Sequence, residues 1–266
     1  MRDQALALVR EVSDPSQGLN LLREYLQALV LRSLHESEAF RPLAFVGGTA
    51  LRFLHSLPRF SEGLDFSTVS AEGYQGRDWM AKVKRDLTLA GFDPMVTWNE
   101  RRVVHTGWIR LPRILHDARL SARPEEKLSI KVEIDTRPPA GARCERRIVT
   151  KHVTFLVQHH DLPSLLAGKL HAVLSRPYAK GRDWYDLVWY LSQRPPVAPN
   201  IPFLQAALDQ TRGAVTNDAR SWRALVRKQL ATLDLKTIRD DVSPFLERPE
   251  DAGLLTSENL AGLLRG

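Results

Sequence analysis

Hydrophobic residues recur at helical spacing in the first part of the chain. Between residues 18 and 38 they repeat every three to four positions, which predicts a long, well-buried helix. The same spacing predicts a shorter helix over residues 4–12, and Pro15 separates the two. A further helix is predicted over residues 78–90, because Gly91 supplies a C-terminal stop signal.

Strand patterns follow in the middle of the chain. Short apolar runs predict strands at residues 43–46 and 153–157, and residues 94–111 predict an antiparallel hairpin. Residues 128–135 alternate strictly between apolar and polar, so this strand is expected to be half-buried. Its polar face carries two carboxylates.

From Asp161 onward the pattern is helical almost to the end, with its main interruption at Pro195 and Pro196. We therefore predict an α/β fold with two lobes. The N-terminal lobe, residues 1–155, combines helices with a small mixed sheet, and the C-terminal lobe, residues 156–266, is mainly helical.

The charge balance points to a polyanionic partner. The 266 residues carry a formal net charge of +7, which favours nucleic acid, with a merely arginine-rich composition as the alternative. Cys144 is the only cysteine, which excludes an internal disulfide and a cysteine-based zinc site. No apolar run is long enough for a membrane span, and the segment after Met1 is amphipathic rather than a signal peptide. We therefore expect a cytoplasmic protein.

A glycine-rich turn, Gly47-Gly48-Thr49, follows the strand at residues 43–46. The glycines allow a sharp turn and leave backbone N–H groups open to an anion. Thr49 is predicted to cap the next helix, whose N-terminus favours negative charge. Asp65 then lies in a second short strand, at residues 63–66. A phosphate-binding turn followed by a carboxylate suits a nucleotide and its metal ion, so Gly48 and Thr49 are candidate nucleotide-binding residues.

Other residues could contact RNA. Trp79, Trp98 and Trp108 could stack on bases, although core packing is the more common role of such residues. The arginines between residues 101 and 147 are candidates for an RNA backbone, with a scattered solvated surface as the alternative. The pair at residues 159–160, two histidines before a helix, lacks metal-ligand spacing, so a cap or surface role is expected.

Two segments resemble the AbiEii/AbiGii toxin family of nucleotidyltransferases, within the polymerase-beta-like superfamily. The family pattern is Gly-Gly-Thr/Ser, then Ser-x-Asp-Leu/Ile-Asp, and residues 61–65 match it except at Gly63, which stands in place of the first Asp. The family's helical half carries Ala-x-Lys-Leu and then Arg-Asp-x-x-Asp-Leu, which residues 167–170 and 182–187 match. The resemblance covers roughly residues 40–195.

The resemblance implies a metal site. Asp65 is the first candidate ligand for Mg²⁺, and Glu133 is the second, because the family places a carboxylate on such a strand. Asp135 shares the polar face with Glu133 and is the substitute. A solvated sheet face is the alternative interpretation for Glu133 and Asp135.

The helical half offers a second group of candidates. Lys169, beside an apolar helix stripe, can place its charge on a phosphate. Asp183 and Asp186 share a helix face, and one of them could accept a proton from the nucleophile or orient Lys169. Arg182 could contact the triphosphate or pair with an aspartate. The alternative is a structural salt-bridge network between two helices.

The family implies the toxin of a toxin–antitoxin pair that transfers a nucleotide from a nucleoside triphosphate with Mg²⁺, for some members to the tRNA 3′ end. We expect the site to lie in the cleft between the two lobes, and we expect a monomer, no membrane association and a cognate antitoxin. Gly63 leaves three alternatives: an enzyme that uses Asp65 and Glu133, a catalytically impaired paralogue that binds nucleotide or RNA, or a disabled substituted form. A nucleotidyltransferase acting on a protein or small molecule is a further alternative.

Overall fold

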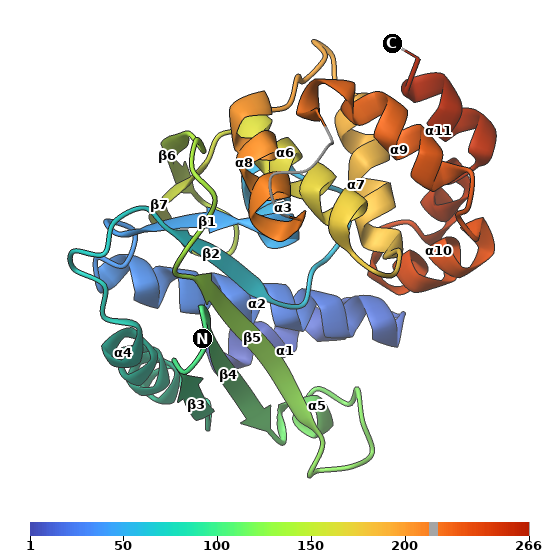
Figure 1. Cartoon of the computed structure of the whole chain (residues 1–266). Coiled ribbons are helices and arrows are strands. Elements are labelled where there is room, and N and C mark those ends of the chain that lie inside the picture. Colours follow the sequence, from blue (N-terminus) through green and yellow to red (C-terminus); the bar gives the residue numbers. More distant parts are fainter. Residues whose placement is uncertain (213–217, 266) are drawn as a thin grey trace. The chain divides into compact units, whose positions relative to one another are not determined.

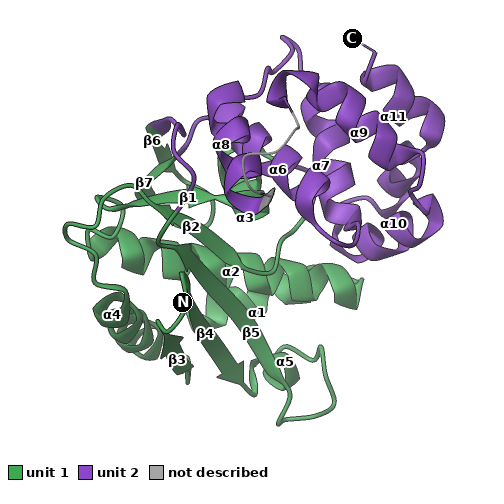
Figure 2. Cartoon of the chain, viewed as in Figure 1, with its two compact units in different colours: residues 1–56, 60–137, 145–159 green, residues 57–59, 138–144, 160–266 purple. Residues whose placement is uncertain are grey.

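The computed structural model describes residues 1–212 and 218–265 (Figure 1). The chain divides into two compact units (Figure 2). Unit 1 contains residues 1–56, 60–137 and 145–159, and unit 2 contains residues 57–59, 138–144 and 160–266. The division into two functional lobes, residues 1–155 and 156–266, remains a prediction from the sequence.

A seven-stranded mixed sheet in the order β3-β4-β5-β2-β1-β7-β6 forms the framework of unit 1. β2 pairs with β5, and β1 with β7, in parallel, whereas the β1–β2, β3–β4 and β4–β5 pairs are antiparallel. The strands are β1 Leu43–Val46, β2 Leu64–Thr68, β3 Met95–Asn99, β4 Val104–Pro112, β5 Lys127–Asp135, β6 Cys144–Val149 and β7 Phe155–His160. The mixed α/β fold class is confirmed.

One face of β5 is apolar and covered, and the other is polar. The apolar positions of β5, from Leu128 to Ile134, are at most 2% exposed, whereas its alternate positions are partly exposed. α2 packs against β5, and α4 packs against β3 and β4. Figure 1 shows α1 and α2 behind the sheet. The strict alternation at residues 128–135 therefore predicted the two faces correctly.

The helices of unit 1 agree with the hydrophobic pattern. Pro15 is the first residue of the long buried helix and Asp14 caps it, because the Asp14 carboxylate accepts a hydrogen bond from the Ser16 N–H. The helices are α1 Arg2–Arg10, α2 Pro15–Glu36, α3 Gly47–His55, α4 Gly76–Leu89 and α5 Ile114–Asp117. The short α5 was not predicted.

A buried carboxylate joins three segments of unit 1. Glu24 of α2 is 2% exposed and contacts Arg52 of α3. Its Oε1 also lies 2.9 Å from His152 Nε2 and 3.4 Å from Lys151 Nζ, in the turn before β7. Burial by itself would raise the pKa of Glu24, but the hydrogen bond with His152 and the charges of Arg52 and Lys151 lower this pKa to about 2.

Acid is therefore expected to destabilise the protein through Glu24. The pKa of this carboxyl is lower in the folded than in the unfolded chain, so its contribution is complete above the unfolded value and is lost as the pH falls toward the folded one. The contribution is about 3 kcal/mol at neutral pH and disappears between about pH 5 and about pH 2. Urea unfolding of the wild type and of Glu24→Gln across this range tests the prediction. Equal pH dependence in the two proteins would contradict it.

Unit 2 is helical, as the pattern after Asp161 predicts. Asp161 caps α6 by accepting a hydrogen bond from the Ser164 N–H. The α-helices are α6 Leu162–Ser175, α7 Gly181–Leu191, α8 Ile201–Arg212, α9 Trp222–Leu230, α10 Leu235–Val242 and α11 Ser257–Leu263. Short 3₁₀ helices occur at Ala219–Ser221, Ser243–Phe245 and Pro249–Leu254.

In the middle of the chain, one strand was missed and one prediction was wrong. β6 was missed because residues 144–148 are all exposed, so its sequence lacks the alternation that indicates a half-buried strand. His159 and His160 belong to β7 and are at most 4% exposed, so they have neither a cap nor a surface role. His160 instead packs edge-on against the Phe203 ring in unit 2.

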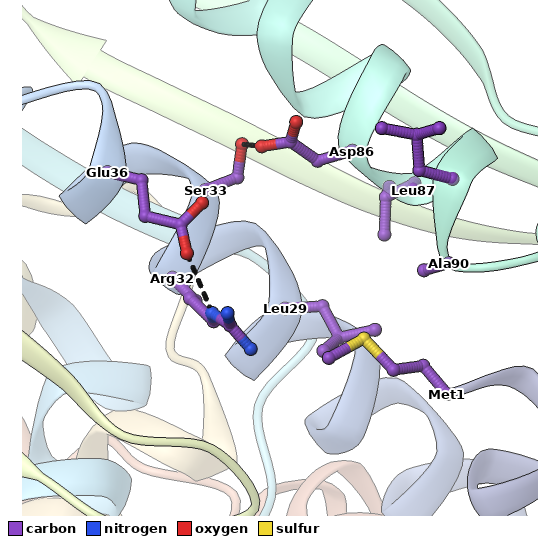
Figure 3. Close-up of a pocket in the computed structure, with 9 residues that line it drawn as sticks. Met1, Leu29, Arg32, Ser33, Glu36, Asp86, Leu87 and Ala90 are labelled. Atoms are coloured by element: carbon purple, nitrogen blue, oxygen red, sulfur yellow. Dashed lines mark hydrogen bonds and ion pairs between the residues drawn. The ribbon is translucent and has the colours of Figure 1, made fainter.

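A cavity of about 330 Å³ lies between α2 and α4 on the helical side of unit 1 (Figure 3). Leu29 and Leu87 line it, and the Ser33 hydroxyl donates a hydrogen bond of 2.6 Å to Asp86 at its edge. Its lining residues differ from the predicted site residues. None of the described helices is both long and apolar enough to cross a membrane.

Candidate functional site

Two of the predicted metal ligands face each other in unit 1. Asp65 on β2 and Glu133 on β5 are directly paired in register across two parallel strands. Directly paired residues point to the same side of a sheet, so both carboxylates lie on its polar face. Asp135 is two pairs further along, opposite Ser67, and so lies on the same face. The structure therefore brings Asp65 and Glu133 together and keeps Asp135 as their nearest substitute.

The glycine turn lies against Asp65. Gly47 has a φ of +79°, and a Cβ atom at this position would lie 2.5 Å from an Asp65 carboxylate oxygen. The turn can therefore approach the carboxylate only because residue 47 has no side chain. Gly48 and Thr49 follow within the first turn of α3, where backbone N–H groups are available to an anion.

The predicted capping role of Thr49 is wrong. α3 begins at Gly47, three residues earlier than expected, and Val46 is its N-cap residue. The Thr49 hydroxyl instead donates a hydrogen bond of 2.5 Å to the carbonyl of Gly63. Thr49 is fully buried, so its side chain connects the turn to the segment that leads into β2.

Replacing Gly47 with alanine is expected to displace Asp65. It should lower the nucleotide transfer that the family resemblance implies by about 100-fold, since a shift of about 1 Å in a reacting group has that effect. Gly73→Ala is the matched control: its φ is +75°, but nothing lies within 4 Å of an added Cβ. Both variants should lose about 1–2 kcal/mol of stability through backbone strain. Transfer rates and urea unfolding test this, and an equal loss of transfer in both variants would contradict it.

The second predicted group comes together in unit 2. Lys169 Nζ on α6 lies 2.8 Å from a carboxylate oxygen of both Asp183 and Asp186 on α7. Arg59 donates two hydrogen bonds of 2.6 Å to Asp186, and Arg176 donates one of 2.6 Å to Asp183. The Asp186 side chain is fully buried.

Charge pairing keeps Lys169 and Asp183 ionised. Burial alone would lower the pKa of Lys169, but Asp183 and Asp186 raise it above its usual value. Burial would raise the pKa of Asp183, but Lys169 and Arg176 lower it. These contacts favour the orienting role of the aspartates over proton acceptance, because both oxygens of Asp186 already accept hydrogen bonds from cations. They also agree with a network that joins two helices.

Arg182 lies beside this group but makes a different contact. Its guanidinium carbon is 4.3 Å from the centre of the Phe245 ring, and the side chain is partly exposed. Arg59 and Arg176 are members of the group that sequence reasoning missed, and Arg59 is the more deeply buried of the two. Its position directly before residues 60–66 was visible, but its partner is 127 residues away in the chain.

A family model described as the nucleotidyl transferase AbiEii toxin of type IV toxin–antitoxin systems matches residues 29–255. The chain belongs to this family. As an AbiEii-family member, the protein is a nucleotidyltransferase, and its family is that of the toxin in a toxin–antitoxin system.

Two solved structures share the fold of this AbiEii-family protein. JHP933 from Helicobacter pylori has 17% sequence identity and a TM-score of 0.50, over 92% of this chain and 90% of that one. A candidate nucleotidyltransferase from H. pylori has 17% identity and a TM-score of 0.51, over 92% of each chain. No functionally curated protein matches the sequence.

Gly63, where the AbiEii pattern has aspartate, lies just before β2 and next to Lys131 of β5. A Cβ at residue 63 would lie 3.0 Å from the Lys131 carbonyl oxygen and 3.8 Å from its Cβ. The Lys131 ammonium lies 2.8 Å from Glu133. The side of the carboxylate pair where the family has a third acidic group therefore carries a lysine, which sequence reasoning did not identify.

The carboxylates fit a magnesium ion that is completed by substrate. Within residues 1–212 and 218–265, no three His, Cys, Asp or Glu side chains converge as a ready-made metal site. Mg²⁺ commonly takes one or two protein carboxylates and completes its octahedral shell with water and phosphate oxygens. The pairing of Asp65 with Glu133, beside the glycine turn at the start of α3, matches that requirement.

Proposed function

We propose that this AbiEii-family protein transfers a nucleotide from a nucleoside triphosphate to an RNA acceptor, the 3′ end of tRNA, with Mg²⁺ as its metal. The observation that carries the proposal is the facing pair Asp65 and Glu133 against the turn at Gly47. The net charge of +7 agrees with a polyanionic acceptor.

In unit 1, Asp65 and Glu133 would hold the metal, whose chemistry is to neutralise phosphate charge and polarise the reacting phosphorus centre. The backbone of Gly48 and Thr49, at the start of α3, would bind the triphosphate through N–H groups. The Thr49 side chain would keep the turn and the residue 63 segment together through its hydrogen bond.

In unit 2, Lys169 would bind a phosphate group of a substrate. Asp183 and Asp186 are positioning residues that hold its ammonium and keep it protonated. Arg182, stacked on Phe245, would supply a further cation for the triphosphate. We also propose that the protein acts as a cytoplasmic monomer with a cognate antitoxin, and that residues 1–155 and 156–266 are its functional lobes.

Transfer of label from each α-labelled nucleoside triphosphate to total tRNA with Mg²⁺ tests the proposal. We expect label on tRNA with the unaltered chain, which carries Gly63, and a large loss with Lys169→Ala. Gly63→Asp is the decisive comparison, because it restores the acidic residue of the family pattern. A Cβ at residue 63 would lie 3.0 Å from the Lys131 carbonyl oxygen, so the backbone must shift slightly to accept it. Activity only in Gly63→Asp would identify a disabled toxin.

The missing acidic group at Gly63 favours one second candidate, an impaired paralogue that binds nucleotide or RNA without transferring. Absence of label from all four triphosphates in all three proteins, with tRNA still bound, would support that candidate and overturn the transferase proposal. Label on a protein or small molecule instead of tRNA would identify a different acceptor.

A further inference from the structure

The polar face of the sheet continues beyond the carboxylate pair onto β4. Thr106 pairs with Glu133, and Trp108 pairs with Lys131, so all of these side chains point to the side that carries Asp65. They are partly exposed, in contrast to Ile109 and the other apolar positions of β4. The carboxylates therefore lie at one side of a larger open surface.

Trp108 is an unusual residue for such a surface. A large aromatic ring is normally buried, as Trp79 is at 4% exposure. Trp108 instead stands among polar neighbours, with the Arg110 guanidinium carbon 5.2 Å and the Lys131 ammonium 5.8 Å from its ring centre. Trp98, in contrast, packs on Gly76 and Gly107 and donates its N–H to Glu100.

A partly exposed aromatic ring with two cations close to it fits a nucleotide. A base stacks on the ring, and the cations attract the phosphates on either side of that base. Aromatic and basic side chains on an open sheet are a recurring way of binding single-stranded RNA. The positive charges of Arg110 and Lys131 are complementary to a polyanion such as RNA.

The strand order indicates which nucleotide this is. β2 and β5, which carry the carboxylates, separate β4 from β1 and its glycine turn. In nucleotidyl transfer, the attacking hydroxyl and the leaving group lie on opposite sides of the reacting phosphorus. If the leaving phosphates lie at the turn, the attacking strand approaches from the side of β4. Trp108 is two strands, or about 10 Å, from Asp65, which the terminal nucleotides of a strand can span.

We propose that the open face of β4 and β5 binds the single-stranded end of the acceptor RNA, with a base stacked on Trp108 and phosphates beside Arg110 and Lys131. This inference rests on the proposed RNA acceptor and goes further by assigning its binding surface. Trp108, Arg110 and Lys131 are specificity-determining and positioning residues for the acceptor rather than for the triphosphate.

Fluorescence anisotropy with a labelled single-stranded RNA oligonucleotide of mixed sequence, in EDTA, tests the surface without any turnover. We expect Trp108→Ala to weaken RNA binding by about tenfold and Trp108→Phe to retain most of it, because a base still has a ring to stack on. Arg110→Ala should lower the slope of log affinity against log salt by about 1. Trp189→Ala, which removes a partly exposed tryptophan of α7, is the control, and thermal unfolding checks that all variants are folded.

Filter binding of each labelled nucleoside triphosphate to the same variants separates the outcomes. Unchanged triphosphate binding with weakened RNA binding supports the proposal. Weakened triphosphate binding with unchanged RNA binding would assign Trp108 to the base of the incoming nucleotide and overturn it, and unchanged binding of both ligands would also overturn it. RNA binding that depends on Trp108 in a protein that transfers no label would refute the proposed function while leaving this surface in place.

Discussion

Replacing Asp186 with alanine is expected to lower the free energy of unfolding by about 3–5 kcal/mol, the usual effect of removing one partner of a buried ion pair. Arg59 is 2% exposed and directs two hydrogen bonds of 2.6 Å to Asp186, and Lys169 Nζ lies 2.8 Å from the same carboxylate. Without Asp186, the guanidinium would stay buried next to a positively charged lysine. Burial by itself would lower the pKa of Arg59, but Asp186 raises it above its usual value. An arginine guanidinium stays protonated in proteins even without such a partner, so the variant cannot relieve the repulsion by losing this charge.

Urea unfolding measures this loss of stability, and two further variants serve as controls. Asp251→Ala removes an ion pair with Arg248, whose side chain is 69% exposed, and should cost no more than about 1 kcal/mol. The double variant Arg59→Met with Asp186→Leu removes both buried charges and should recover much of the stability that Asp186→Ala loses. A loss below about 1 kcal/mol in Asp186→Ala would mean that the network contributes little to folding.

Replacing Asp65 with asparagine is expected to lower nucleotide transfer by about 1,000-fold, because loss of a charged metal ligand removes several kcal/mol of transition-state stabilisation. Stability should change little, since Asp65 is on a partly exposed face. Label transfer at saturating Mg²⁺, together with a titration of Mn²⁺ binding by its magnetic resonance signal, measures both consequences. Mn²⁺ binding should weaken in parallel with transfer.

Asp135→Asn is the matched control for Asp65→Asn. Asp135 lies on the same face two residue pairs along the strand, and its side chain accepts a hydrogen bond from the Arg137 N–H. We expect Glu133→Gln to reproduce the Asp65 result and Asp135→Asn to leave transfer within about tenfold of the wild type. A large loss in Asp135→Asn with little loss in Glu133→Gln would assign the second metal ligand to Asp135.

Local patterns predicted those features that depend on a few neighbouring residues. The alternation at residues 128–135 established which side chains of β5 are buried, because successive side chains of a strand point to opposite faces. Helical spacing located α2, α6 and α7, because residues three to four apart lie on the same face of a helix. The AbiEii motifs identified Asp65 and Lys169, because each motif is a short stretch of chain.

Where local signals were absent or ambiguous, only the folded chain decided. Threonine is a common N-cap residue, yet the Thr49 hydroxyl donates its hydrogen bond to the Gly63 carbonyl, because β2 packs beside α3. β6 carries no apolar alternation, so pairing rather than sequence makes it a strand.

Long-range pairing also assembled the candidate site. Residue type and local pattern were enough to identify Asp65 and Glu133 as candidate metal ligands on strands. They also identified Lys169 as a candidate phosphate-binding residue on a helix. Tertiary structure decided that Asp65 faces Glu133, that Lys131 lies beside Gly63, and that Arg59 neutralises Asp186. Each of these contacts joins residues far apart in the chain, and their partners are set by strand register and helix packing, which local propensity does not encode.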